Sequence, residues 1–479
     1  MSLHITQQGE ESCFPAENRG KCRYRRKGPV FLAAAAAVVM SVAAGIVLWP
    51  NGAPLVSSAY AVQEAEYPEM APYPDESKLL DGTLDSEAFQ KEYDAWQAGR
   101  SAQLNQPEGY QEGMKGFLTA VTHQFLSGAE EENRVVSPLN VYMALAMLAE
   151  TTGGGSRAQL LELLGAEDMA ALRSQAHAVW NANYCDDGAS KSLLANSLWL
   201  SNQVEFSPTA VELLADTYYA SVYQGGMGSD ELDNALRDWI NRQTDGLLEE
   251  QAAGLSLEPE TLLALVSTVS FEAKWQNTFS EDNTREGVFH GAQGNVQCPF
   301  LHQSGARTYY WGEGFSAVSL PFDEGGAMWL ILPDMGVEAE QLLSQEEAMA
   351  FLLADGEWEN ARQVVVNLSL PKFDVSSSLD LQEGLKALGV SDIFSAETAD
   401  FSPILADGGP VSLTQAEHAA RVTVDEEGCS AAAYTVMAAA GAAIPPEEEI
   451  DFVLNRPFLF AITGRDGLPM FVGVVNQPL

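Results

Sequence analysis

The feature that most restricts the folding of this chain is an alanine-rich segment that ends in prolines and glutamates. It reads CSAAAYTVMAAAGAAIPPEEE, and eight of the fourteen residues from Ser430 to Ala443 are alanine. Alanine favours helix, but a helix that is apolar on every side must be buried or lie in a membrane. The sixteen uncharged residues 429–444 are too few to cross a bilayer. The segment must therefore be uncharged for another reason.

The composition describes an acidic chain with enough apolar residues for a large core. Its 479 residues are 46% hydrophobic, and the formal net charge is −42. Binding to nucleic acid needs clustered Lys and Arg, so we expect no nucleic-acid partner. The five cysteines form no C-x-x-C pair, which argues against a disulfide framework or a zinc site. We expect no metal and no cofactor.

Residues 30–49 form an uncharged apolar run of twenty residues behind the basic sequence KCRYRRKG. That length matches the hydrocarbon core of a membrane, and the cations predict that residues 1–29 stay in the cytoplasm. We favour an uncleaved signal anchor. The alternative is a signal peptide core, with cleavage after Ala61 in an A-x-A-like sequence. Either interpretation exports the rest of the chain, which is then extracellular and either membrane-bound or secreted.

The exported part divides into a stalk and a domain. Residues 50–108 are acidic and contain several prolines, which predicts an extended, solvated stalk. One helix is predicted within it, capped by Asp85 or Ser86 and ended by Gly99. In residues 109–479, helical apolar stripes precede strand-rich runs such as VVVNLSLPKF and FVLNRPFLFAI. Because the two patterns do not alternate, the sequence predicts an α+β fold rather than repeated βαβ units.

Motifs of catalysis are not recognisable in the sequence. It contains neither the nucleophile elbow G-x-S-x-G nor H-E-x-x-H. The six histidines are dispersed along the chain. A catalytic triad is assembled in space rather than in sequence, so a hydrolase stays a third option, but we expect that the chain is not an enzyme.

Five motifs, in this order, resemble successive signatures of the serpins, a family of serine protease inhibitors. They are RVVSPLNVYMALAML, NSLWLSNQVEF, LVSTVSFEAKWQNTF, VTVDEEGCSAAAYTV, and FVLNRPFLFAI with MFVGVVNQP. The resemblance covers residues 109–479 and is to a bacterial-type serpin with an N-terminal membrane anchor or signal segment. It implies the serpin fold, with a large central sheet A, two smaller sheets, about nine helices and an exposed reactive-centre loop.

The resemblance also implies a mechanism and a partner. The family's target protease cleaves the loop and is held as a covalent acyl-enzyme while the loop inserts into sheet A. The family's loop length, counted from Gly428, places the reactive bond between Ala442 and Ala443, and alanine suits an elastase-type pocket. We therefore expect a monomeric suicide-substrate inhibitor of an elastase-like serine protease. The alternative is a non-inhibitory serpin-fold protein that acts in binding or adhesion.

Insertion explains why the alanine-rich segment carries no charge. Side chains alternate along a strand, so Cys429, the first residue to enter, and every second residue after it should face inward. A lone inward charge would cost several kcal/mol, and each of these positions is small or apolar. The predicted hinge residues are Glu426, Glu427, Gly428, Cys429, Ser430, Ala431, Ala432, Ala433, Tyr434 and Thr435.

A second set of residues matches the family's shutter and breach positions, which control the opening of sheet A. Asn140 stands where the family usually has Ser, and Ser267 where it usually has Asn. This exchange keeps the same hydrogen-bonding groups. The predicted shutter and breach residues are Ser137, Asn140, Ser267, Trp275 and His418.

Overall fold

The computed structural model describes residues 57–129, 131–323, 325–353, 358–406, 410–429, 446 and 448–478. The hinge residues 430–435, the predicted reactive bond at residues 442–443 and the apolar run at residues 30–49 lie outside these ranges. Among the described residues, no helix is long and apolar enough to cross a membrane.

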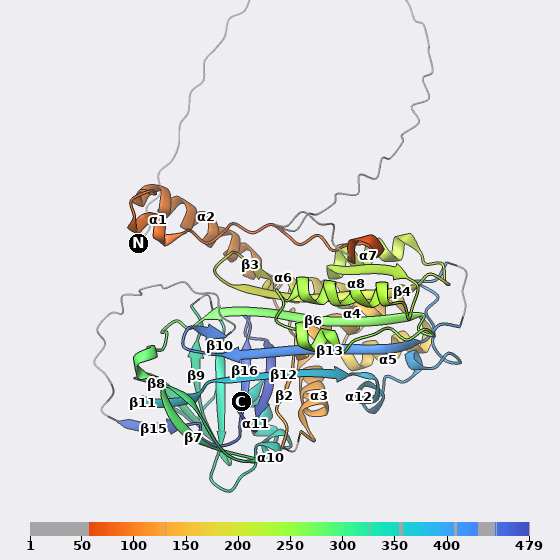
Figure 1. Cartoon of the computed structure of the whole chain (residues 1–479). Helices are drawn as coiled ribbons and strands as arrows, with labels where there is room; N and C mark the ends of the chain where they lie inside the picture. Colours follow the sequence, from red (N-terminus) through yellow and green to blue (C-terminus); the bar gives the residue numbers. More distant parts are fainter. Residues whose placement is uncertain are drawn as a thin grey trace, which may run out of the picture. The chain divides into compact units, whose positions relative to one another are not determined.

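The first sheet, which we call sheet A, contains eight strands in the described part of the chain (Figure 1). In spatial order its strands are β1 (Ala61–Gln63), β5 (Ala220–Gly225), β4 (Lys191–Ser201), β6 (Leu263–Lys274), β14 (Gly428–Cys429), β13 (Leu413–Val424) and β12 (Phe373–Asp380), with β3 (Cys185–Asp186) paired to β4. The sheet is mixed, because β6 runs parallel to β13 and antiparallel to β4. It corresponds to the large central sheet A that the family resemblance implies.

The second sheet contains nine strands within the described ranges, where two smaller sheets were expected. They are β15 (Glu449–Val453), β11 (Ala361–Pro371), β8 (Gly294–Gly312), β9 (Phe315–Pro321), β10 (Ala327–Pro333), β16 (Phe458–Thr463), β17 (Pro469–Val475) and β2 (Arg134–Val136), with β7 (Arg285–Gly291) paired to β8. The two expected sheets are joined because β8 is 19 residues long and pairs with β11, β7 and β9.

The described residues contain twelve α-helices, not about nine. The count of about nine came from the family resemblance, and five of the twelve helices have seven residues or fewer, a length that carries little periodicity in the sequence. The helices are α1 (Glu76–Leu80), α2 (Ser86–Leu104), α3 (Met114–Leu126), α4 (Pro138–Thr151), α5 (Gly154–Leu164), α6 (Met169–Asn183), α7 (Pro208–Tyr218), α8 (Asp230–Gln243), α9 (Glu249–Ala253), α10 (Ala339–Leu343), α11 (Glu346–Leu352) and α12 (Gln382–Ala387).

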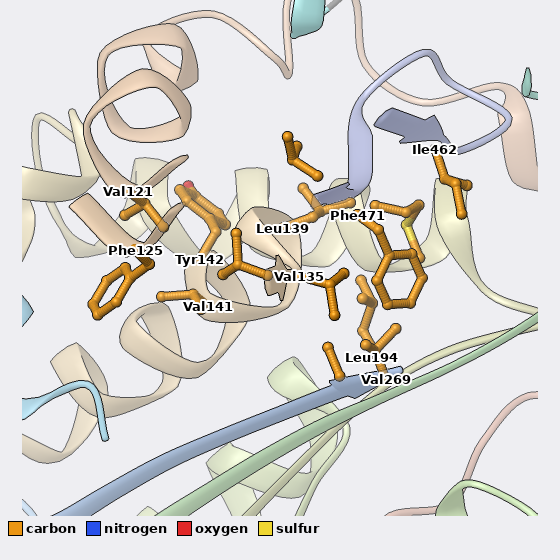
Figure 2. Packing of buried hydrophobic residues seen from close by; sticks show 14 of the residues in the cluster. Val121, Phe125, Val135, Leu139, Val141, Tyr142, Leu194, Val269, Ile462 and Phe471 are labelled. Carbon is orange, nitrogen blue, oxygen red and sulfur yellow. The ribbon is translucent and has the colours of Figure 1, made fainter. Parts of the chain in front are cut away.

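The core is built around α4, in which every residue is buried. This helix contacts β6 of sheet A and β17 of the second sheet. Figure 2 shows Leu139 of α4 beside Val135 of β2 and Phe471 of β17, with Val269 of β6 nearby. A helix that is apolar all round must be enclosed in this way. The first turn of α4 is consequently fixed against the strands of sheet A, and this turn carries the predicted shutter residue Asn140, with Ser137 as its N-cap.

Residues 57–104 pack against the rest of the chain, which differs from the extended, solvated stalk expected for residues 50–108. The segment contributes the edge strand β1, which pairs antiparallel with β5, and the helices α1 and α2. Asp85 caps α2 as predicted, but the helix continues through Gly99 to Leu104, so the predicted end was wrong. Glycine inside a helix costs only about 1 kcal/mol, and tertiary contacts can outweigh that cost.

Candidate functional site

The hinge enters sheet A at β14, between β6 and β13. Gly428 pairs with Lys274 and Cys429 pairs with Ala273, both on β6, while Cys429 also pairs with Val424 on β13. Only glycine fits at position 428, because an added Cβ would lie 2.1 Å from the carbonyl oxygen of Ala273. The position predicted as the first to enter is therefore inside the sheet, with its side chain 2% exposed.

Trp275 holds the turn that leads into β14. Its indole Nε1–H donates to the carbonyl oxygen of Asp425 at 2.9 Å, and its main-chain N–H donates to that of Glu427 at 2.9 Å. The indole also stacks on Phe322, with ring centroids 5.1 Å apart. The Asp425 carboxylate closes the turn by accepting from the main-chain N–H groups of Glu427 and Gly428. Trp275, Asp425, Glu427 and Gly428 form the breach cluster.

Glu426 anchors the same turn from its other side. Its carboxylate accepts from Thr284 Oγ1 at 2.7 Å and from Lys372 Nζ at 2.6 Å. Burial alone would raise the pKa of this carboxyl, but the hydrogen bonds from Lys372 and Thr284 outweigh burial and lower the pKa. Glu426 is therefore a structural anchor at the start of the hinge and stays outside the sheet.

The shutter cluster comprises Ser137, Asn140, Asn196, Ser267 and His418, all of them buried. Ser137 caps α4 by accepting from the main-chain N–H of Asn140 at 3.2 Å, and its own N–H donates to His418 Nε2 at 3.0 Å. The side-chain amide of Asn140 donates to Ser267 Oγ at 2.7 Å and to the carbonyl oxygen of Thr268 at 2.8 Å. The structure thus connects the four predicted shutter residues, which lie up to 281 positions apart.

Sequence reasoning missed Asn196, the fifth member of the cluster. Its side-chain amide donates to Asn140 Oδ1 at 3.4 Å from the neighbouring strand β4. A signal was available, because Asn196 is a polar residue in the middle of the buried strand sequence LLANSLWL. A buried polar side chain needs a hydrogen-bond partner, but strand alternation alone does not say which one.

His418 is neutral in the folded protein. Complete burial lowers its pKa from 6.5 to about 4. Because Nε2 accepts the N–H of Ser137, the ring proton lies on Nδ1, which has no hydrogen-bond partner among the described residues. On the same strand, burial and the charge of Asp380 raise the pKa of Glu417 to about 7. The pKa of His418 is therefore shifted down from its ordinary value, whereas the pKa of its neighbour Glu417 is shifted up.

The direct pairing of β6 with β13 ends just beyond this cluster. His418 pairs with Ser267, and the last described pair joins Ala419 to Thr268. Farther along β6, residues Val269–Glu272 separate this parallel pairing from β14. At the shutter end of sheet A, β6 and β13 therefore pair directly with each other. At the breach end, the hinge strand β14 lies between them.

Replacing His418 by Gln should change how stability depends on pH. The unfolded imidazole, with a pKa of 6.5, binds a proton between pH 6.5 and 4 that the folded one does not. The contribution of His418 to the free energy of unfolding is therefore complete above pH 6.5. It falls by about 2 kcal/mol between pH 7.5 and 5.0. We expect wild type to lose about that much more unfolding free energy than His418→Gln over this range, as measured by urea titration.

Glu417 contributes to the pH dependence of stability with the opposite sign. This contribution is the same in wild type and variant, so it cancels when the two are compared. His123→Gln, at an exposed histidine of α3, serves as the control and should follow wild type. Equal pH dependence in wild type and His418→Gln would contradict a buried neutral imidazole.

Replacing Trp275 by Phe should loosen the hinge while keeping an aromatic ring against Phe322. The variant loses the hydrogen bond to Asp425, which is worth about 1 kcal/mol. We expect alkylation of the buried Cys429 thiol to become about fivefold faster, as measured by mass spectrometry of labelled peptides. Cys298, also buried, gives the internal reference rate. An unchanged ratio of the Cys429 and Cys298 rates would show that Trp275 does not hold the hinge.

Comparisons with known proteins agree with this geometry. Residues 112–478 match the family model described as "Serpin (serine protease inhibitor)". Serpin-ZX of Arabidopsis thaliana is 28% identical over 378 residues, covering 76% of this chain and 96% of the relative. Alpha-1-antitrypsin 1-3 of Mus musculus is 29% identical over 374 residues, covering 76% and 87%. These relatives come from a plant and the mouse, so a bacterial type stays a prediction.

Solved structures show the same fold. The native state of Tengpin, a thermophilic serpin, superposes with a TM-score of 0.69 at 25% identity, covering 78% of this chain and 95% of that one. Serpins are in general protease inhibitors rather than catalysts, and their targets are in general serine proteases. The family match covers most of the chain and includes both the hinge and the shutter cluster. This chain belongs to the serpin family.

Proposed function

We propose that this chain is a suicide-substrate inhibitor of serine endopeptidases of the elastase type. One observation supports the proposal most directly. Gly428 and Cys429 already form a strand between β6 and β13, which are the two strands that a longer insert would separate. The hinge is the beginning of an added strand, and strand addition is how an inserting loop gains main-chain hydrogen bonds.

The register of β14 shows how this strand would continue. It is antiparallel to both neighbours, with Cys429 opposite Ala273 on β6. The next four residues of the loop, 430–433, would pair with Glu272 back to Val269. Because β6 does not pair directly with β13 along these four residues, this first stage leaves the shutter intact.

Further growth of the strand would reach the shutter itself. Moving six residues from Cys429 to Thr435 moves each antiparallel partner back by six, to Ser267 on β6 and His418 on β13. Those two residues now pair with each other. Insertion past residue 433 therefore replaces the β6–β13 pairing with two new ladders. The hydrogen bonds of the shutter cluster then act as the barrier to insertion.

The proposed reactive bond joins Ala442 to Ala443. After cleavage, the strand 429–442, of which Cys429 is already in the sheet, would span about 46 Å at about 3.3 Å per residue. A protease held on Ala442 as an acyl-enzyme would be carried across the sheet. A small residue on the acyl side suits an elastase-type pocket. We propose that the inhibitor acts as a monomer on an extracellular protease.

Incubation with an elastase, followed by denaturing electrophoresis, tests this function. We expect a covalent band at the summed mass of inhibitor and protease. Thr435→Arg should change the protein from inhibitor to substrate, because its cation would have to enter between Ser267 and His418, where a lone charge costs several kcal/mol. Val436→Arg is the matched control. It places the same cation on the opposite face of the strand and should still give the complex.

Two outcomes would contradict the proposal in different ways. Clean cleavage of wild type with undiminished elastase activity would remove the inhibitor function and favour the alternative, a non-inhibitory protein of binding or adhesion. A full yield of complex from Thr435→Arg would instead contradict the register derived from β14.

We also propose that the chain is exported, with residues 30–49 as an uncleaved membrane anchor and the serpin domain outside the cell. The twenty-residue apolar run behind a basic segment supports this proposal. The protein should stay in the membrane pellet after extraction with alkaline carbonate, and the mass of the intact chain should include its N-terminal segment. A soluble protein that begins at residue 62 would show signal-peptide cleavage after Ala61.

A further inference from the structure

The segment at residues 57–104, which we call the N-terminal strap, is attached to the outer edge of sheet A. Its strand β1 pairs with β5, with Ala61 opposite Tyr223. Ser57 at its start is completely buried and donates from Oγ to Asp238 of α8 at 2.7 Å. Arg242 of α8 donates to Ser57 Oγ at 2.8 Å and lies 3.4 Å from the carboxylate of Glu64. The strap therefore begins on the β5 side of the sheet.

Beyond β1, the strap packs on an aromatic stack. Tyr67 stacks on Trp180 with ring centroids 5.7 Å apart, and Trp180 stacks in turn on Tyr184 at 4.6 Å. The Tyr67 hydroxyl donates to Gln243 at 3.2 Å. Trp180 and Tyr184 belong to α6 and its C-terminal cap. Tyr184 directly precedes β3, so these contacts lead toward the strand pair β3–β4.

The far end of the strap reaches a buried carboxylate. Trp96 of α2 is 4% exposed and donates from Nε1 to Asp187 Oδ2 at 3.0 Å, while the main-chain N–H of Tyr73 donates to the Asp187 carbonyl oxygen at 2.8 Å. The same Asp187 oxygen lies 3.7 Å from Arg465, in the turn between β16 and β17. The strap therefore contacts the ion pair that links sheet A to a turn of the second sheet.

A second contact joins α2 to the second sheet. The guanidinium of Arg100 lies over the Trp96 ring, 5.1 Å from its centroid. A Cβ added to Gly325, in the turn between β9 and β10, would lie 3.1 Å from Arg100 Nη2. Arg100 therefore packs closely on that turn. Two residues four positions apart on one helix contact both sheets: Trp96 donates to Asp187, in the turn that leads into β4, and Arg100 lies against the second sheet.

Opening of sheet A places strain on this arrangement. A new strand between β6 and β13 widens the sheet by about 4.8 Å. Strands β1, β5, β4 and β6 lie on one side of the insert, whereas β13 and β12, which contact β2 of the second sheet, lie on the other. The strap contacts the first group along its length and the second sheet at its end, so separation of the two groups disturbs its contacts.

We propose that the N-terminal strap restrains the opening of sheet A and sets the rate at which a strand inserts between β6 and β13. This inference rests on the proposed loop insertion. It gives residues 57–104 a regulatory role within the same molecule: release of the strap, by cleavage or by a competing partner, makes the inhibitor insert faster and lose its inhibitory form sooner.

Trp96→Phe in the full chain tests the proposal, because an aromatic ring is kept while the donor to Asp187 is lost. The matched control is Trp358→Phe, whose indole N–H donates to the Trp311 carbonyl oxygen at 3.1 Å on an exposed site outside the strap. The probe is a synthetic peptide with the sequence of residues 429–442, which can add to sheet A without any protease. Its uptake is followed by native electrophoresis, and hydrogen exchange of residues 86–104 reports whether α2 is docked.

We expect Trp96→Phe to exchange faster in α2 and to take up the peptide about tenfold faster than wild type, and Trp358→Phe to follow wild type. Faster exchange with unchanged uptake would overturn the strap as a restraint, and unchanged exchange would overturn Trp96 as its attachment. If wild type and variant both refuse the peptide at all temperatures below unfolding, the insertion mechanism fails and takes this inference with it. A missing elastase complex with strap-dependent uptake would remove only the inhibitory function.

Discussion

The structure depends on a competition for the main-chain groups of β6. Along Leu263–Thr268 these groups pair with β13, and at Ala273 and Lys274 they pair with the hinge. The same edge of β6 cannot pair with both β13 and the inserted strand. Once the loop has paired with Val269–Glu272 of β6, every further loop residue must therefore replace an existing β6–β13 pair. Two alternative ladders of similar geometry make the sheet a bistable element, and small contacts at its ends can bias which ladder forms.

The shutter cluster disfavours states between the two pairings, because its groups are polar and buried. A buried amide or hydroxyl that loses its partner pays a desolvation penalty larger than the hydrogen bond is worth when formed. Asn140 contacts β6 through Ser267 and β4 through Asn196, while His418 ties β13 to the first turn of α4. Partial separation of the strands would leave several of these groups without partners. The sheet therefore favours being fully closed or fully opened by a strand that offers new partners.

The N-terminal strap adds a restraint that the family motifs do not include. Its contacts combine aromatic stacking with hydrogen bonds to two carboxylates, the half-buried Asp238 and the buried Asp187. Prolines and acidic residues in residues 50–108 favour an extended chain in isolation. Glu64 faces Arg242, and Glu66 and Glu69 are exposed to solvent. A composition typical of a solvated linker is therefore compatible with a docked segment.

The sequence by itself determined the features that depend on neighbouring residues. Alternation along a strand placed Cys429 inward, the capping pattern started α2 at Asp85 or Ser86, and the serpin motifs identified Ser137, Asn140, Ser267 and His418 as one group. Only the tertiary structure decided which distant groups meet: Asn196 with Asn140, Trp96 with Asp187, and β1 with the edge of β5. The physical reason is that side-chain size and alternation are local properties of the chain. A hydrogen bond or a stacked ring exists only when folding brings two remote segments within a few ångströms.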